Sequence, residues 1–272
     1  MTRQLSLAHL TAIDAPPPVL IEAAAEAGFD AVGLRLLRVT ADSPGYPLMD
    51  DAGAMHETRA ALRGTGLRVS DIEFIKITPE IDIPGLLPML DAGAELGARH
   101  VITAPYDEDL ERLADRLGIL SEAAEERGLT AVLEFFPWTP VPDLSACWKV
   151  VKAAGPRTGM LVDALHFDRS GSSSDELAAL PAERLPFAHL CDALVLAEYT
   201  TEQLLHTARA ERLSPGTGEI DLVRFIGALP QDIPLGLEVP VSGRNHSKSL
   251  TDRLSELRSA TITLLETVHG TA

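Results

Sequence analysis

The chain has 272 residues, 46% of them hydrophobic and 4% aromatic, and its 40 Asp and Glu against 23 Lys and Arg give a formal net charge of -17. This charge repels polyanions, so we expect no nucleic acid partner and no association with an anionic membrane. No run of about 18 apolar residues predicts a membrane span, and residues 1–18 lack the apolar core of a secretion signal. Because Cys147 and Cys191 are far apart in sequence, we expect no disulfide and a cytoplasmic protein.

Eight short apolar runs alternate with helical segments rich in Ala, Leu and Glu, a pattern typical of repeated βα units around a parallel sheet. The units average about 34 residues, enough for one strand, one helix and two loops. We therefore predict an α/β fold with one domain over residues 1–272, a single (β/α)8 TIM barrel, and keep a doubly wound open sheet as the alternative. The predicted strands are 4–10, 31–37, 68–75, 100–105, 130–136, 159–164, 187–193 and 234–239.

Glycine and proline mark the ends of the predicted helices. Pro16 to Pro18 open the first helical segment and Gly28 closes it, the order of proline first and glycine last that helix ends favour. Glycine closes three more segments shortly before the next strand. The predicted helices include 17–28, 55–66, 86–97, 110–128 and 249–268.

Polar residues lie within or at the ends of the last four predicted strands. In a (β/α)8 barrel, side chains at the C-terminal ends of the strands converge on one site. A single polar residue at a strand end is commonly a cap or a loop residue, but four at equivalent ends favour a shared site. These residues are Glu134, Asp163, His189 and Glu238.

Three carboxylates in one pocket raise one another's pKa, because each negative charge disfavours ionisation of its neighbours. A divalent cation removes this repulsion. Oxygen ligands with one nitrogen suit Mn²⁺, Mg²⁺ or Co²⁺, and Zn²⁺ also accepts carboxylate and imidazole ligands. The sequence therefore predicts one divalent metal ion bound by these four residues, without deciding which metal.

His166 follows Asp163 by three residues, so the two side chains would face opposite sides if one strand ran through both. They converge only if the strand ends near Ala164 and the chain turns there. We therefore predict that His166 is not a primary ligand but contacts a substrate oxygen or orients a ligand. A simple loop-capping role is the alternative.

Three other residues are candidates for substrate binding. His9 and Arg35 lie near the ends of the first two predicted strands, where either could reach a substrate oxygen, although a structural ion pair would explain Arg35 equally well. Trp138 lies in the stiff aromatic segment 135–143, which could wall the pocket or pack against a neighbouring subunit. Formation of a homo-oligomer is left open.

At these residues the chain resembles the sugar phosphate isomerase/epimerase superfamily, the xylose-isomerase-like TIM barrels. That group includes ketose 3-epimerases, inosose dehydratase, 3-dehydroshikimate dehydratase and endonuclease IV. The resemblance covers nearly the whole chain, from SLAHLT and AAAEAGFDAVGLR to the last strand, and includes an Asp-x-x-His motif at Asp163 and His166. It implies a metal site of Glu134, Asp163, His189 and Glu238, with both glutamates also moving protons on opposite faces of the substrate.

Two departures from this superfamily leave the substrate open. No Arg follows His189 closely, and Arg212 is separated from Pro215 by two residues, where relatives often place an Arg directly before such a proline. We retain Arg212 as a candidate substrate-binding residue, with Glu134, Glu238 and His166 as the candidate catalytic residues.

The sequence thus predicts a metal-dependent isomerase or epimerase that removes a proton next to the carbonyl of a small polyhydroxy, sugar-like substrate through a metal-stabilised enediolate. The alternative is a dehydratase of the inosose or 3-dehydroshikimate type, which begins with the same step. A phosphodiesterase of the endonuclease IV type would need a basic groove, which the charge of -17 disfavours. A non-catalytic partner subunit is the remaining alternative.

Overall fold

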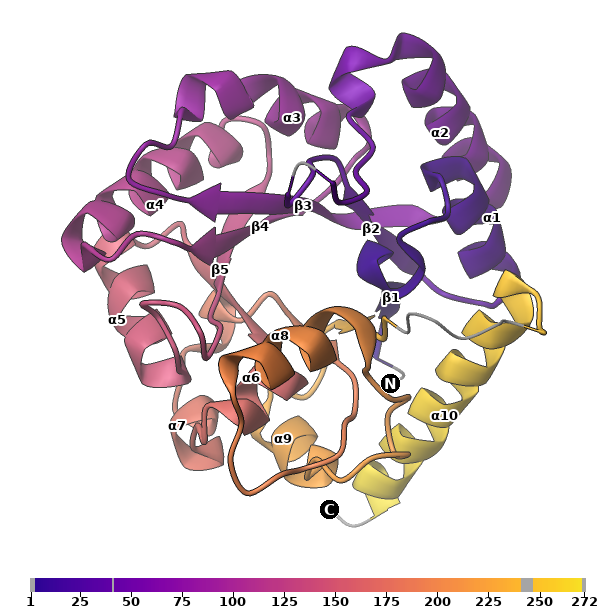
Figure 1. The fold of residues 1–272 in the computed structure, drawn as a ribbon. Coiled ribbons are helices and arrows are strands. Elements are labelled where there is room, and N and C mark those ends of the chain that lie inside the picture. The colour runs from indigo at the N-terminus through magenta and orange to yellow at the C-terminus, as the bar shows by residue number, and fades with distance from the viewer. Residues whose placement is uncertain (1–2, 41, 241–246, 271–272) are drawn as a thin grey trace.

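Eight parallel strands form a closed barrel in the computed structural model, which describes residues 3–40, 42–240 and 247–270 (Figure 1). The strands pair in chain order, and β8 pairs with β1 to close the ring, so the predicted (β/α)8 barrel is confirmed and the open sheet is wrong. The strands are β1 (Leu5–Leu7), β2 (Ala31–Arg35), β3 (Arg68–Ile77), β4 (His100–Pro105), β5 (Thr130–Glu134), β6 (Gly159–Asp163), β7 (Phe187–Leu190) and β8 (Leu235–Leu237).

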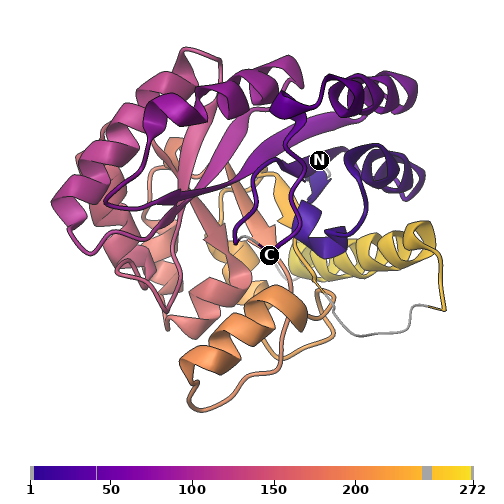
Figure 2. The same ribbon diagram turned by 45° about the horizontal axis from the view of Figure 1, so that its top comes forward.

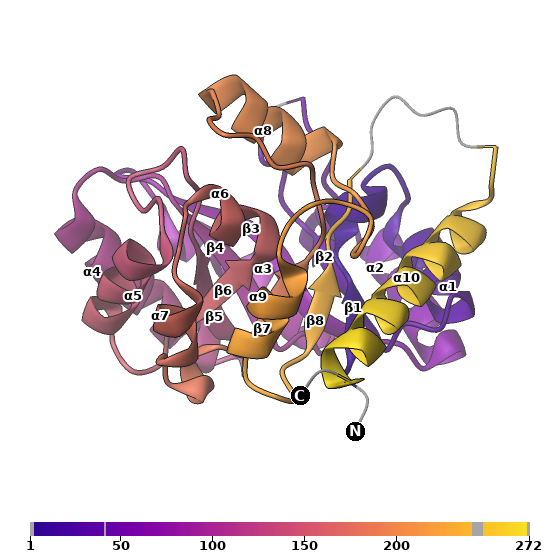
Figure 3. The same ribbon diagram turned by 90° about the horizontal axis from the view of Figure 1, so that it is seen from below.

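Helices surround the barrel and bury their apolar sides against the strands (Figures 1 and 2). Helix α8 is different, because it lies beyond the C-terminal ends of the strands, above the mouth of the barrel (Figure 3). The helices are α1 (Pro17–Glu26), α2 (Ala52–Thr65), α3 (Ile83–Glu95), α4 (Leu110–Glu125), α5 (Leu144–Ala154), α6 (Ala164–Arg169), α7 (Ser174–Ala178), α8 (Thr201–Ala210), α9 (Leu222–Ala228) and α10 (Leu250–Gly270).

Several strands are shorter than predicted, because the chain turns directly after them. The first ends at Leu7, and the following residues form a short 3-10 helix, His9–Ala12. Strand β6 ends at Asp163 and α6 begins at Ala164, with the Asp163 carboxylate accepting a hydrogen bond from the Leu165 N–H as the helix cap. The predicted turn between Asp163 and His166 is therefore confirmed.

A small apolar cluster of Ile102, Val132, Leu161 and Phe187 is separate from the larger core between strands and helices. Three of its members precede Glu134, Asp163 and His189 by two residues each. Because side chains alternate along a strand, they face the barrel interior together with those polar groups. The candidate site therefore rests on an apolar floor.

The two cysteines are free and buried, as expected from their spacing. Among the described residues, no helix combines the length and apolar character needed to cross a membrane.

Candidate metal centre

The structure brings together the four residues predicted to bind a metal. Glu134 and Asp163 end β5 and β6, His189 lies on β7, and Glu238 directly follows β8. One potential ligand atom from each lies within 4.8 Å of all the others. All four side chains are buried, so the group forms a closed cluster below the mouth of the barrel.

Several buried atoms of this cluster have no hydrogen-bond partner within the described structure. They are Oε1 of Glu134 and both ring nitrogens of His189. The Nδ1 atom of His189 lies 3.8 Å from Asp163 Oδ2 and 3.8 Å from Glu238 Oε2. Unpartnered buried polar atoms are costly, and a cation between these groups would satisfy them. Oxygen donors with one imidazole nitrogen fit a divalent cation such as Mn²⁺, Mg²⁺, Co²⁺ or Zn²⁺.

The three carboxyl groups of the cluster differ in acidity. Burial raises the pKa of Glu134 well above its usual range, and the charges of Glu238 and Asp163 raise it further. Burial also favours the protonated form of Asp163, but Arg212 outweighs it and lowers the pKa to about 2. For Glu238, burial raises the pKa although Arg212 opposes the change. Asp163 is therefore a permanent anion, whereas Glu134 is the group best suited to hold a proton.

Arg212 contributes a fixed positive charge to the cluster. Its side chain is 2% exposed, with Nη1 2.6 Å from Asp163 Oδ2 and Nη2 2.7 Å from Glu238 Oε2. Its Nε donates a hydrogen bond to the Ala208 carbonyl at 3.0 Å, which fixes the guanidinium from α8. Asp163 and Glu238 raise the pKa of Arg212, so it remains charged despite burial.

His166 lies beside the four-residue cluster and is not part of it. Its Nε2 is 3.8 Å from Glu134 Oε1, and its ring contacts the rings of Phe136 and Trp138 at centroid distances of 4.7 and 5.2 Å. Burial lowers the pKa of His166 to about 3, so the imidazole is neutral near pH 7. A neutral imidazole can donate a proton from one nitrogen and accept one at the other.

A narrow cavity of about 70 Å³ opens onto the cluster, and aromatic rings form much of its wall. Trp138 is in this wall, and whether it contacts a substrate stays a prediction. Arg35 and Arg212 also line it, together with Glu73 on β3. The lining residues are Leu10, Arg35, Val39, Glu73, Phe74, Tyr106, Glu134, Phe136, Trp138, His166, Ala208, Arg209, Arg212 and Glu238.

His9 and Arg35 are both engaged by protein partners. Arg35 Nη2 pairs with Glu73 Oε2 at 2.7 Å, so the structural ion pair, one of the two alternatives for Arg35, is present. His9 does not line the cavity; its Nδ1 accepts the backbone N–H of Arg35 at 2.9 Å, and its Nε2 lies 3.0 Å from the Ala15 carbonyl oxygen. His9 therefore supports the end of β2 from below the pocket surface.

Glu73 was missed because it lies inside a predicted strand rather than at its end. The signal was present in RVSDIEFI, where Asp71 and Glu73 are two residues apart and so face the same side of β3. Both are buried, and burial alone raises the pKa of Glu73, but Arg35 outweighs it and lowers the value. Glu73 is therefore ionised and balances the charge of Arg35.

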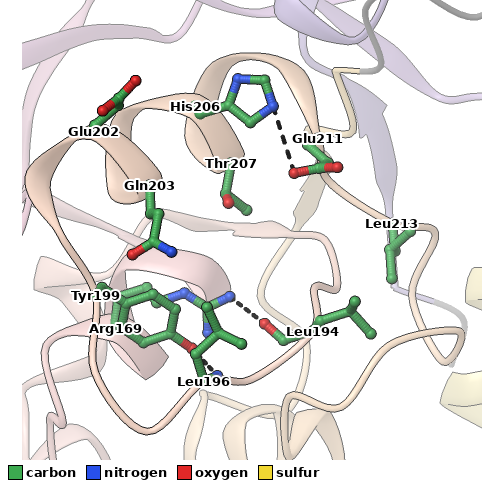
Figure 4. A pocket seen from close by; sticks show the side chains of 10 residues that line it. All are labelled: Arg169, Leu194, Leu196, Tyr199, Glu202, Gln203, His206, Thr207, Glu211 and Leu213. Carbon is green, nitrogen blue, oxygen red and sulfur yellow. Dashed lines mark hydrogen bonds and ion pairs between the residues drawn. The ribbon is translucent and has the colours of Figure 1, made fainter.

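A larger hollow of about 690 Å³ lies between α8 and the segment after β7 (Figure 4). In it Arg169 stacks over Tyr199, with 4.3 Å from the guanidinium carbon to the ring centroid, and His206 Nε2 lies 3.5 Å from Glu211 Oε2. None of the four clustered residues lines this hollow. We therefore assign the site to the smaller cavity, where the carboxylates and the imidazole meet.

The closed barrel with carboxylates and an imidazole gathered at its strand ends defines the class of protein, a TIM barrel with a candidate metal centre. A family model described as the xylose isomerase-like TIM barrel matches residues 21–259, and the chain belongs to this family.

Two curated relatives are 3-dehydroshikimate dehydratases. The protein of Pseudomonas putida KT2440 is 28% identical over 156 residues, covering 56% of this chain and 24% of the relative. The protein of Pseudomonas aeruginosa PAO1 is 30% identical over 152 residues, covering 54% of this chain and 23% of the relative. The matched part thus spans about a quarter of each relative's length.

Solved structures share the fold at low sequence identity. The IolI protein with a bound zinc atom gives a TM-score of 0.79 at 18% identity, covering 97% of this chain and 99% of the other. A D-allulose 3-epimerase from Methylomonas sp. gives a TM-score of 0.68 at 15% identity, covering 97% of this chain and 96% of the other. These structures share the fold of the xylose isomerase-like TIM barrels, the family to which the family model assigns the chain.

Proposed function

We propose that the protein is a divalent-metal-dependent isomerase or epimerase that removes a proton next to the carbonyl of a small polyhydroxy substrate. The observation that carries this proposal is the convergence of four ligand atoms within 4.8 Å, with Nδ1 of His189 and Oε1 of Glu134 unpartnered. Glu134, Asp163, His189 and Glu238 would hold the ion. A bound cation would supply stabilisation for the negative charge that develops on the substrate oxygen as the proton leaves.

The side chains around the candidate metal centre have different roles in this proposal. Asp163 stays ionised, because Arg212 holds its pKa at about 2, and so acts as a ligand only. Glu134 and Glu238 are the acid/base pair, because both carboxyl groups line the cavity as well as the candidate metal centre. His166, neutral and 3.8 Å from Glu134 Oε1, is placed to contact a substrate oxygen. The rings of Phe136 and Trp138 line this side of the pocket and would limit the access of water to it.

A dehydratase is the second candidate, and two observations favour it. Both curated relatives carry that activity in their names. Arg209 lines the cavity, and in the part of the chain that the structure describes no ion pair or hydrogen bond of its side chain is seen, so it is available for a carboxylate on the substrate. The aromatic wall would suit the flat face of a ring. The first step, proton removal next to a carbonyl, is the same in both candidates, and in a dehydratase a β-hydroxyl then leaves.

The test is incubation with Mn²⁺ and a panel of ketoses, inososes and 3-dehydroshikimate in D₂O. We expect deuterium at a carbon next to the carbonyl of at least one compound, and no exchange with the Glu134→Gln variant. An isomeric product supports the first candidate, and loss of water with a new ultraviolet absorbance supports the second. The proposal is refuted if the protein binds no divalent ion and exchanges no panel member.

A further inference from the structure

Inside the barrel, on the floor side of the metal centre, lie a carboxylate and an imidazole nitrogen that the proposed function does not use. Asp71 is on β3, two residues before Glu73, and is 2% exposed. Its Oδ1 and the Nε2 of His189 are both buried, and neither has a hydrogen-bond partner in the described structure. Two such groups in one barrel interior call for a common explanation.

Two glycines on neighbouring strands leave room for these side chains, because neither glycine has a Cβ that would collide with them. Asp71 pairs with Gly33 on β2, and a Cβ at Gly33 would lie 2.5 Å from Asp71 Oδ1. His189 pairs with Gly236 on β8, and a Cβ there would lie 2.7 Å from the Cδ2 of its ring and 3.1 Å from Nε2. The carboxylate therefore lies over β2 and the imidazole over β8.

Strand β1 lies between β2 and β8, so the two groups approach it from opposite sides. Ser6 of β1 pairs with Gly236, and its Oγ is 3.3 Å from the same Cβ position that lies 3.1 Å from His189 Nε2. A hydroxyl, a carboxylate and a ring N–H are the polar partners that a buried water needs.

The orientation of His189 adds a chemical requirement. Its Nδ1 faces Asp163 and Glu238, so Nδ1 must present a lone pair if it is to bind a cation. In the neutral ring the proton then lies on Nε2, which points away from the carboxylates. Burial and Glu73 raise the pKa of Asp71 to about 6, and the His189 imidazole opposes this change.

We propose that Asp71 is a positioning residue for His189: its carboxylate accepts the Nε2–H through one water shared with the Ser6 hydroxyl. This contact holds the Nδ1 lone pair toward Glu134, Asp163 and Glu238. Metal-binding histidines generally donate their second N–H to a carboxylate, a carbonyl or water, which fixes the tautomer and the ring orientation. The inference rests on the proposed metal-dependent function, but its first test needs no metal.

That first test is nitrogen NMR of the histidine rings in the metal-free protein, with the His189 signals assigned from a His189→Asn variant. We expect His189 of the wild type to carry a proton on Nε2 that exchanges slowly with solvent because it has an acceptor, and we expect faster exchange of this proton in Asp71→Leu. A wild-type ring protonated only on Nδ1 would overturn the proposal.

The second test is the affinity for Co²⁺, followed by its visible absorption. We expect Asp71→Leu to weaken binding by about 10-fold to 100-fold, and Asp71→Asn, which keeps an acceptor oxygen, to lose less. The metal-free variants should unfold at the same or a higher denaturant concentration, because a buried carboxylate has been removed. A residue needed only for folding would instead lower the stability.

Thr103→Val is the matched control, because Thr103 is also a buried polar residue of the barrel and its hydroxyl donates to the Val132 carbonyl at 2.9 Å. We expect its Co²⁺ affinity to equal that of the wild type. Unchanged affinity in Asp71→Leu would overturn the proposal, and if this variant does not fold, Asp71→Asn decides in its place. If the wild type binds no Co²⁺, the proposed function fails, while the measurement of the His189 Nε2–H still decides the role of Asp71.

Discussion

Replacing Arg212 by Met removes a guanidinium group that contacts two residues of the candidate metal centre. The side chain is 2% exposed and pairs with Asp163 at 2.6 Å and with Glu238 at 2.7 Å. The lowering of the Asp163 pKa from 3.8 to about 2 corresponds to about 2 kcal/mol of net stabilisation of its charged form. Removing one partner from a buried ion pair costs about 3 to 5 kcal/mol, because the other charge is left uncompensated. We therefore expect the free energy of unfolding of the metal-free variant to fall by about 3 to 5 kcal/mol.

The dependence of this loss on pH follows from the sign of the pKa change. Asp163 has a lower pKa in the folded protein than in the unfolded chain, so its contribution is present above about pH 4 and is lost as the pH falls toward 2. In Arg212→Met, burial raises the Asp163 pKa without this opposing charge. The contribution then becomes unfavourable at neutral pH, and the difference between wild type and variant should narrow in acid.

The assay is urea unfolding of the chelated protein, repeated with saturating Mn²⁺. A cation between Asp163 and Glu238 replaces part of the missing positive charge, so we expect metal to reduce the deficit of the variant. Arg59→Met is the control, because Arg59 and Glu95 are 47% and 45% exposed and such pairs contribute less than about 1 kcal/mol. If Arg212→Met costs no more than this control, the buried pairs do not stabilise the site as argued.

Three further predictions concern the metal and the proton. Burial and the neighbouring carboxylates raise the pKa of Glu134 in the metal-free protein, so we expect Mn²⁺ binding to release protons and to tighten as pH rises. Calorimetry in two buffers tests this, and the absence of proton release would contradict it. The His166→Gln variant should keep the Mn²⁺ affinity of the wild type but exchange the substrate proton at least about tenfold more slowly, whereas the exposed control His206→Gln should change neither property. Loss of metal binding in His166→Gln would argue against a role of His166 in contacting the substrate. Gly236→Ala would place a Cβ 2.7 Å from the His189 ring, so equilibrium dialysis should show at least about tenfold weaker Mn²⁺ binding, and unchanged binding would contradict this geometry.

The barrel could be predicted because its signal is local. Each strand is a short apolar run, and its order in the sheet follows the order in the chain. The ends of strands were less accurate, because they depend on where the next turn begins. At His9 the backbone leaves the strand for a 3-10 helix, in which the ring packs on Tyr46 at a centroid distance of 5.0 Å. Such a contact between segments far apart in sequence has no local signal.

The clustered residues were found because each lies at or near the end of its own strand. Arg212 was identified only as a departure from a motif, and its pairing with Asp163 depends on where α8 ends above the barrel mouth. Asp71 shows only the two-residue spacing to Glu73, and its importance depends on glycines in two other strands. The sequence thus predicts which residues point into the barrel. To predict which of them contact one another across the barrel, the register between the strands must also be known.

A count of charges explains why the guanidinium group of Arg212 alone does not neutralise the carboxylates of the cluster. Arg35 and Glu73 form an ion pair, and Arg212 balances one of the three carboxylates Glu134, Asp163 and Glu238 when all are ionised. Two negative charges then remain, which equals the charge of one divalent ion. Without that ion the deficit appears as the raised pKa of Glu134. Arg212 also leaves Nδ1 of His189 unsatisfied, because a guanidinium only donates hydrogen bonds and the lone pair of Nδ1 needs a cation or a donor aimed at it.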